Sequence, residues 1–139
     1  MSKRYIVAVE GVPPSPSPIS NAVVVASQCW ISGQLSVGDD GAYLPGSARE
    51  EAERAFASVF RIAEAAGFAR DDIVYVDIAF ADLADVKEVN GLYAELFAEG
   101  RRPARTIYQA AKLPFGGKVK VQAVAAREDT RATDERRRG

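Results

Sequence analysis

Arg105 stands at a point in the chain where a guanidinium can hold a carboxylate. It follows the Pro103-Ala104 corner and precedes a strand-like run that begins at Thr106. The guanidinium is planar and charged at any working pH, and its donors can pair with both oxygens of one carboxylate. The residue types and their spacing therefore predict an anchor for a small carboxylate ligand at Arg105.

Several other chemistries are excluded by composition. The chain has no histidine and one cysteine, Cys29. This excludes Ser-His-Asp and Cys-His nucleophiles, imidazole metal sites and an intrachain disulfide. Cys29 lies in an apolar run, which predicts an inert buried thiol. We expect neither a metal ion nor a cofactor.

The bulk properties favour one compact domain. The chain has 139 residues, of which 47% are hydrophobic, and a net charge of -1. This length suits a single core, and this charge is unlike that of nucleic-acid binders. No apolar stretch approaches the roughly 20 residues of a membrane span, and the N-terminus lacks a signal-peptide core. We expect a cytoplasmic protein with neither a nucleic-acid nor a membrane partner.

The elements that must position Arg105 follow from hydrophobic periodicity. A capping box at 47–50 begins a helix whose apolar stripe runs from Ala52 to Ala63, with a stop at Gly67. A second helix is predicted to begin at the cap Asp82 and to end at Gly100. Runs of β-branched and aromatic residues predict strands at 4–9, 22–26, 29–33, 73–80, 106–111 and 118–126.

This order predicts an α+β fold with a mixed β-sheet and two helices packed on one face. We expect a single domain over residues 1–126 and a flexible charged tail over 127–139. In the last strand, Val119 and Val121 alternate with Lys118 and Lys120. A sheet with helices on one face leaves the other face to be covered, which favours a partner subunit.

Four segments match, in order, the motifs of one known family. They are Pro18-Ile19-Ser20-Asn21-Ala22, Trp30-Ile31-Ser32-Gly33-Gln34, Val89-Asn90-Gly91-Leu92-Tyr93, and the run from Arg102 through Leu113-Pro114 to Ala125. These segments, which span about residues 18–126, resemble the Rid family of reactive intermediate imine deaminases. The Pro-Ala-Arg and Leu-Pro pair is the most specific part of the match.

The resemblance implies a chorismate-mutase-like fold that assembles as a homotrimer, with ligand clefts between subunits. It also implies hydrolysis of a 2-imino or 2-enamino carboxylic acid to a 2-keto acid and ammonia. The arginine holds the carboxylate of the substrate, and a glutamate on the last strand positions water. On this basis the predicted catalytic residues are Arg105 and Lys120. The predicted substrate-binding residues are Ile19, Ser32, Gly33, Asn90, Arg105, Ile107 and Gln122.

Two positions depart from the family pattern. Ile19 replaces a tyrosine, and Lys120 replaces the water-positioning glutamate. A carboxylate accepts a proton from water, whereas an ammonium does not. A lysine beside Arg105 would also make the pocket doubly cationic.

Several readings of Lys120 follow. Deaminase activity persists through water held by backbone carbonyls and Gln122 or Tyr108, or the pocket takes a dicarboxylate-like imine or enamine. Alternatively, catalysis is lost and the protein binds small carboxylates. Lys120 could also extend into solvent without a role, or act as a base or Schiff-base nucleophile. A ribonuclease or translation inhibitor is disfavoured by the net charge and the lack of histidine.

Overall fold

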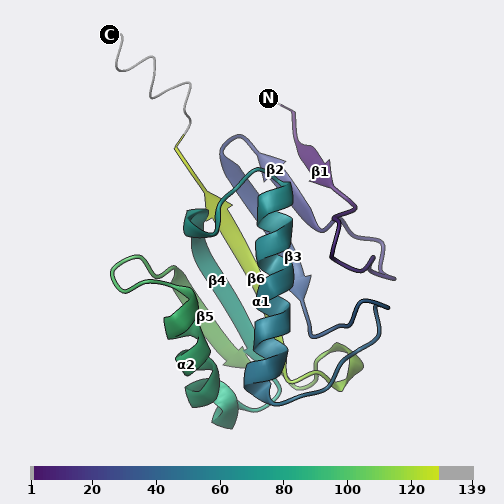
Figure 1. Ribbon diagram of the computed structural model, residues 1–139, viewed down its shortest axis with the longest axis vertical. Coiled ribbons are helices and arrows are strands. Elements are labelled where there is room, and N and C mark those ends of the chain that lie inside the picture. The colour runs from purple at the N-terminus through teal and green to yellow at the C-terminus, as the bar shows by residue number, and fades with distance from the viewer. Residues whose placement is uncertain (1, 129–139) are drawn as a thin grey trace.

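The computed structural model describes residues 2–128, and a six-stranded sheet forms their centre with strand order β1-β2-β3-β6-β4-β5 (Figure 1). β4 and β5 pair in parallel and the other neighbours pair antiparallel, which confirms the predicted mixed sheet. The strands are β1 (Arg4–Ile6), β2 (Ala22–Val25), β3 (Gln28–Gln34), β4 (Ile73–Phe80), β5 (Ala104–Gln109) and β6 (Val119–Ala126).

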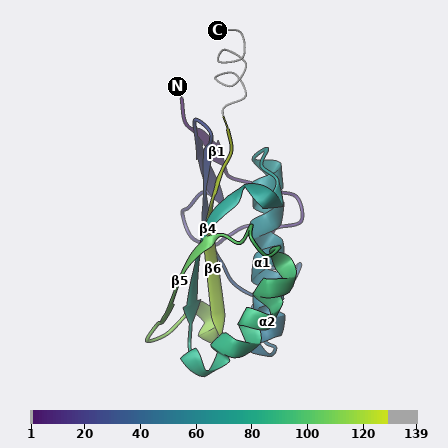
Figure 2. The same cartoon turned by 90° about the vertical axis from the view of Figure 1, so that its left-hand side faces the viewer.

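Both helices, α1 (Ala48–Ala65) and α2 (Val86–Leu96), cover the same face of this sheet (Figure 2). The predicted capping box at the start of α1 is confirmed, because Ser47 and Glu50 exchange hydrogen bonds. Gly67, just after α1, has a φ of 92°, the left-handed conformation that favours glycine at a helix end.

The second helix differs from its predicted bounds. Asp82 caps a 3-10 turn (Leu83–Asp85) that leads into α2, and α2 ends at Leu96 rather than at Gly100. The early end has a packing reason. Phe97 turns into an extended conformation and places its ring 4.8 Å from that of Tyr93 and 6.0 Å from that of Phe56. The aromatic core therefore ends the helix before the glycine does.

The apolar face of β6 lies under α1. Val119, Val121, Ala123 and Ala125 are at most 3% exposed, as their alternation with polar residues predicts. Cys29 on β3 is fully buried, and its burial raises the pKa of the thiol. This is the inert buried cysteine that the sequence indicates.

The opposite face of the sheet carries a row of apolar side chains without a helix over them. Tyr5, Val23, Trp30, Val124 and Tyr75 pair in register across β1, β2, β3, β6 and β4. Tyr5 is 59% and Trp30 53% exposed. We call this set the open-face row. Exposed apolar groups gathered in this way mark an interaction surface.

The limits of the described residues bear on two further expectations. Of the predicted tail 127–139, Arg127 and Glu128 are described, and the rest lies outside the described residues. Within residues 2–128, neither helix has the length and apolar character required to cross a bilayer.

One buried carboxylate joins three parts of this fold. Glu51, in the first turns of α1, is completely inaccessible to solvent. Its Oε2 accepts from the Tyr43 hydroxyl at 2.7 Å and from the Gly46 N–H at 3.3 Å, and its Oε1 accepts from the Lys118 N–H at 2.9 Å. The Lys118 ammonium lies 3.5 Å from Oε2. Glu51 thus fastens the loop before α1 to the segment that enters β6.

Replacing Glu51 by glutamine should weaken this junction. The change puts an amide donor where a carboxylate oxygen accepts hydrogen bonds, so we expect Glu51→Gln to lower the free energy of unfolding by about 1–3 kcal/mol. Urea unfolding at neutral pH measures this loss. The matched control is Glu53→Gln, which breaks an exposed ion pair with Arg49 and should leave the unfolding midpoint unchanged. Equal midpoints for the two variants would contradict the role of Glu51.

The same junction predicts a pH effect. Burial, together with the hydrogen bond to Glu51, raises the pKa of Tyr43 from 10.0 to about 12. Because this pKa is higher in the folded than in the unfolded chain, protonated Tyr43 stabilises the folded chain. This contribution to the free energy of unfolding is fully present below about pH 10 and is lost progressively as the pH rises to about 12. In Glu51→Gln, the tyrosinate absorbance assigned to Tyr43 should appear at lower pH, and Tyr43→Phe should remove it.

Candidate functional site

The predicted anchor, Arg105, lies on β5 beneath α2. β4, α2 and β5 form a strand-helix-strand unit, which carries the chain over the sheet and brings Asn90 of α2 above Arg105. Arg105 Nη1 donates to Asn90 Oδ1 at 2.8 Å. The structure therefore brings these two predicted residues together.

The ring of Tyr93, also on α2, packs against the guanidinium of Arg105. The Arg105 Cζ lies 4.7 Å from the centroid of the Tyr93 ring, a cation–π contact. Burial raises the pKa of Tyr93, against the opposing charges of Arg105 and Arg102. Tyr93 follows Asn90 by three residues, so both lie on one face of α2. This spacing is the sequence signal by which Tyr93 could have been identified as part of the site.

Arg105 is available for an anion. Within residues 2–128, no carboxylate pairs with its guanidinium, and the shallow cavity beside it is lined by Asn90, Tyr93, Arg102 and Pro103. Asn90 occupies part of the donor set, and the remaining donors suit a carboxylate. We call this region the arginine half-site.

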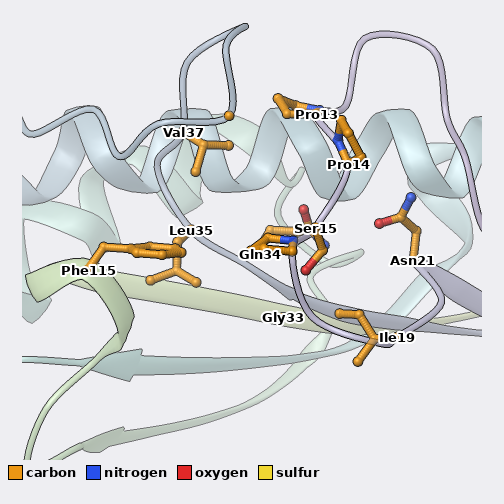
Figure 3. Close-up of a pocket in the computed structure, with 12 residues that line it drawn as sticks. Pro13, Pro14, Ser15, Ile19, Asn21, Gly33, Gln34, Leu35, Val37 and Phe115 are labelled. Carbon is orange, nitrogen blue, oxygen red and sulfur yellow. The ribbon is translucent and has the colours of Figure 1, made fainter.

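A second cavity lies on the other side of the molecule, between the proline-rich loop (residues 11–18) and β3 (Figure 3). Its lining includes the predicted residues Ile19 and Gly33, which Figure 3 shows with Gln34 and Ser15. At the opposite end of the pocket from Ile19 lie Phe115 and Leu35. We call this region the proline-loop pocket.

Ser32 and Gly33 shape this pocket in different ways. The Ser32 hydroxyl donates to the Ser20 carbonyl oxygen at 2.7 Å, which fastens the proline-rich loop to β3. Gly33 lies where the pairing of β3 with β6 shifts register, and a Cβ there would come within 3.1 Å of the Lys120 Cδ. The missing side chain at Gly33 thus lets the Lys120 stem lie against the backbone of β3.

The two regions do not meet within one chain. Arg105 pairs with Val76 on the helix-covered face, whereas Lys120 pairs with Ala79 on the open face. Gly33 and Arg105 lie on β3 and β5, which two strands separate, a distance of roughly 14 Å at about 4.8 Å per strand. Within a single chain Lys120 does not lie beside Arg105, because their partners on β4, Val76 and Ala79, are three residues apart and therefore lie on opposite faces of the sheet.

The other two predicted binding residues, Ile107 and Gln122, line neither of these two cavities. Ile107 is half-buried, pairs with Ile78 and packs against the hydrophobic core. Gln122 is exposed on the open face, paired with Asp77. Ile107 thus helps to hold β5 under α2, and Gln122 points from the same face as Lys120.

Several residues that line the proline-loop pocket are not among the predicted site residues. Leu35 and Phe115 line it from β3's end and from the turn before β6. An apolar residue between Pro114 and Gly116, in a turn, was the signal that could have identified Phe115. Within residues 2–128, no group of three or more His, Cys, Asp or Glu side chains is placed to hold a metal ion.

Comparisons with known proteins agree with this architecture. The Endoribonuclease L-PSP family model matches residues 11–127. A 2-iminobutanoate/2-iminopropanoate deaminase of Bos taurus is 37% identical over 123 residues, which cover 88% of this chain and 89% of that protein. RidA from the Antarctic bacterium Psychrobacter sp. PAMC 21119 has a TM-score of 0.83 at 30% identity, covering 89% of this chain and all of that one. E. coli TdcF, solved with bound serine, has a TM-score of 0.82 at 28% identity, covering 90% of this chain and 100% of that one.

Proposed function

The chain belongs to the Rid family, whose model bears the name Endoribonuclease L-PSP, and we propose that it hydrolyses a 2-imino or 2-enamino carboxylic acid. The products are a 2-keto acid and ammonia. The observation that carries the proposal is the Arg105 guanidinium, which Asn90 and Tyr93 orient and which no carboxylate of residues 2–128 neutralises. The deaminase name of the bovine relative and the serine bound to TdcF support the same chemical class.

The reaction requires an anchored substrate and an oriented water. Arg105 holds the substrate carboxylate, so that C2 of the imine has a fixed position. Water adds its oxygen to C2 and the nitrogen gains a proton. The hydroxyl proton of the tetrahedral intermediate then passes to the nitrogen as the C–N bond breaks, which releases ammonia and leaves the 2-keto acid. Holding both reactants in place supplies a large part of the acceleration. Gln122, Tyr108 and backbone carbonyls are the proposed partners of the water.

We propose a homotrimer whose clefts join the arginine half-site of one subunit to the proline-loop pocket of the next. Within one chain the two regions lie apart, and the open-face row leaves apolar side chains exposed. Packing that face against another subunit would bury the row. The same contact would supply the second half of each cleft.

The assembly can be tested at the open-face row. Trp30→Asp places a charge on the proposed interface, so we expect a trimer mass for the wild type and a smaller mass for the variant by light scattering at micromolar concentration. Leu83→Asp is the matched control, because Leu83 is 45% exposed but lies in the turn before α2. A monomeric wild type would reject the proposed cleft.

The role of Arg105 as the carboxylate anchor can be tested with one variant that removes the charge and one that keeps the charge but removes the planar guanidinium. Arg105→Ala should keep the fold and weaken 2-keto acid binding by about 2–5 kcal/mol, the usual range for breaking a desolvated charge pair. Arg105→Lys should restore part of this loss, since an ammonium keeps the charge without the planar fork. Titration calorimetry measures both, and Arg101→Ala is the control because Arg101 pairs with Asp71 on the surface. Unchanged affinity in Arg105→Ala would reject the anchor.

The side chain at position 120 bears on whether the ligand carries one carboxylate or two, and on whether the protein is a catalyst. If a neighbouring subunit brings Arg105 to the proline-loop pocket, Lys120 adds a second positive charge that favours a dicarboxylate-like imine or enamine. A Lys120 ammonium at roughly 4 Å from a ligand carboxylate, with an effective dielectric of about 20, contributes about 4 kcal/mol before the cost of desolvation is subtracted. The alternative function is carboxylate binding without catalysis, because Lys120 stands where the family has a glutamate.

We expect Lys120→Glu to raise ammonia release from monocarboxylic imines and to lower affinity for dicarboxylates about tenfold or more. Lys112→Glu, an exposed lysine before the Leu113-Pro114 pair, is the control. Ammonia release on a panel of enzyme-generated imines is the measurement. No ammonia from the wild type, with 2-keto acid binding intact, would favour the binding protein. If Lys120→Glu changes neither ammonia release from monocarboxylic imines nor the affinity for dicarboxylates, Lys120 lies outside the cleft.

We do not propose an action on RNA. The chain has a net charge of -1 and no histidine. Within residues 2–128, Arg102 and Arg105 line one cavity, whereas Lys120 lies against Gly33 of β3, so these cations do not form the stripe of basic and aromatic side chains typical of an RNA-binding surface.

A further inference from the structure

Phe115 has a backbone conformation that an aromatic residue rarely adopts. Its φ is 63° and its ψ is 8°, in the left-handed region, although glycines follow at 116 and 117. In residues 2–128, the other non-glycine residue with positive φ is Ala26, in the turn between β2 and β3. A phenylalanine at such a position is unfavourable unless its side chain gains something in return.

Packing in the hydrophobic core does not offset the unfavourable backbone conformation of Phe115. The Phe115 side chain is 56% exposed, and it is not among the buried residues of the core. Within residues 2–128 its ring stacks on no other aromatic ring. The strained backbone therefore holds an aromatic ring partly in solvent.

The ring lies at one end of the proline-loop pocket. Figure 3 shows Phe115 and Leu35 at that end, with Val37 above them, and Ile19 and Asn21 at the other. The turn is fitted closely there, since a Cβ at Gly117 would come within 3.0 Å of the Leu35 Cδ2. Its far side is fixed because the Lys118 N–H donates to the buried Glu51. This end of the pocket is apolar and firmly held.

We propose that Phe115 is a specificity-determining residue that contacts an apolar side chain of the ligand. The proposal rests on the proposed function, because it assigns the substituent of the 2-imino acid rather than the reaction. The carboxylate would meet the arginine half-site, and an aliphatic or aromatic substituent would lie against Phe115 and Leu35. Burying such carbon surface is favourable, and a short or polar substituent gains less from the same contact.

The test compares substrate side chains. An amino-acid oxidase supplies imines of leucine, phenylalanine, alanine and aspartate, and kcat/KM is measured for each. We expect Phe115→Ala to lower the preference for the leucine and phenylalanine imines over the alanine imine by about tenfold or more. An unchanged preference would overturn the proposal.

A matched pair of glycine variants separates strain from recognition. Phe115→Gly and Ala26→Gly both relieve a positive φ, so each should keep or raise Tm, by a few degrees at most. Of the two, Phe115→Gly alone should lose the preference for apolar side chains. A lower Tm or a smaller assembly mass for Phe115→Gly would show that the ring packs between subunits, and would overturn the proposal.

A binding measurement distinguishes this inference from the proposed function. Calorimetry with 4-methyl-2-oxopentanoate and pyruvate reports the side-chain preference even when no imine is hydrolysed. Loss of the preference in Phe115→Ala without any turnover in the wild type would reject the deaminase and keep the role of Phe115. If the wild type hydrolyses imines but the wild type and Phe115→Ala show the same side-chain preference, the deaminase stands and the role of Phe115 is rejected.

Discussion

The buried carboxylate of Glu51 is the interaction on which the shape of the proline-loop pocket depends. A charged group without access to solvent is tolerated when hydrogen bonds satisfy it, and here Tyr43, Gly46 and Lys118 do so. Two of these donors belong to the loop before α1, and Lys118 enters β6. One side chain of α1 thereby joins two chain segments that both contribute to the lining of the pocket, through Val37 and Phe115.

The sheet determines what a single subunit can and cannot do. It separates Arg105, under α2, from Lys120, because these two residues occupy opposite faces of the sheet. A carboxylate anchored at Arg105 cannot reach Gly33 of the same chain through two intervening strands. The proposed trimer gives a physical reason for both the exposed open-face row and the divided site.

In the proposed cleft, three kinds of side chain contact different parts of the ligand. Arg105 gives charge and orientation, and Tyr93 and Asn90 keep its fork in one place. Lys120, whose stem lies against Gly33 of the proline-loop pocket, would add a second positive charge in the proposed cleft. Phe115 offers an apolar surface, held by a turn whose backbone would suit glycine better. A ligand with one carboxylate and an apolar substituent uses the first and third of these, and a dicarboxylate uses the first two.

The sequence by itself determined the elements and their order, because the capping box at Ser47 and the alternation of Val119 and Val121 are local patterns with local physical causes. It also predicted Arg105 and Asn90 as members of one site, and the structure joins their side chains by a hydrogen bond of 2.8 Å. Tertiary packing decided the rest. Phe97 ended α2 before Gly100, and strand pairing placed Lys120 away from Arg105 within the chain. Contacts between segments distant in sequence buried Glu51 and placed Phe115 at the proline-loop pocket. Faces and register across strands arise from pairing between segments, so periodicity within one segment does not contain them.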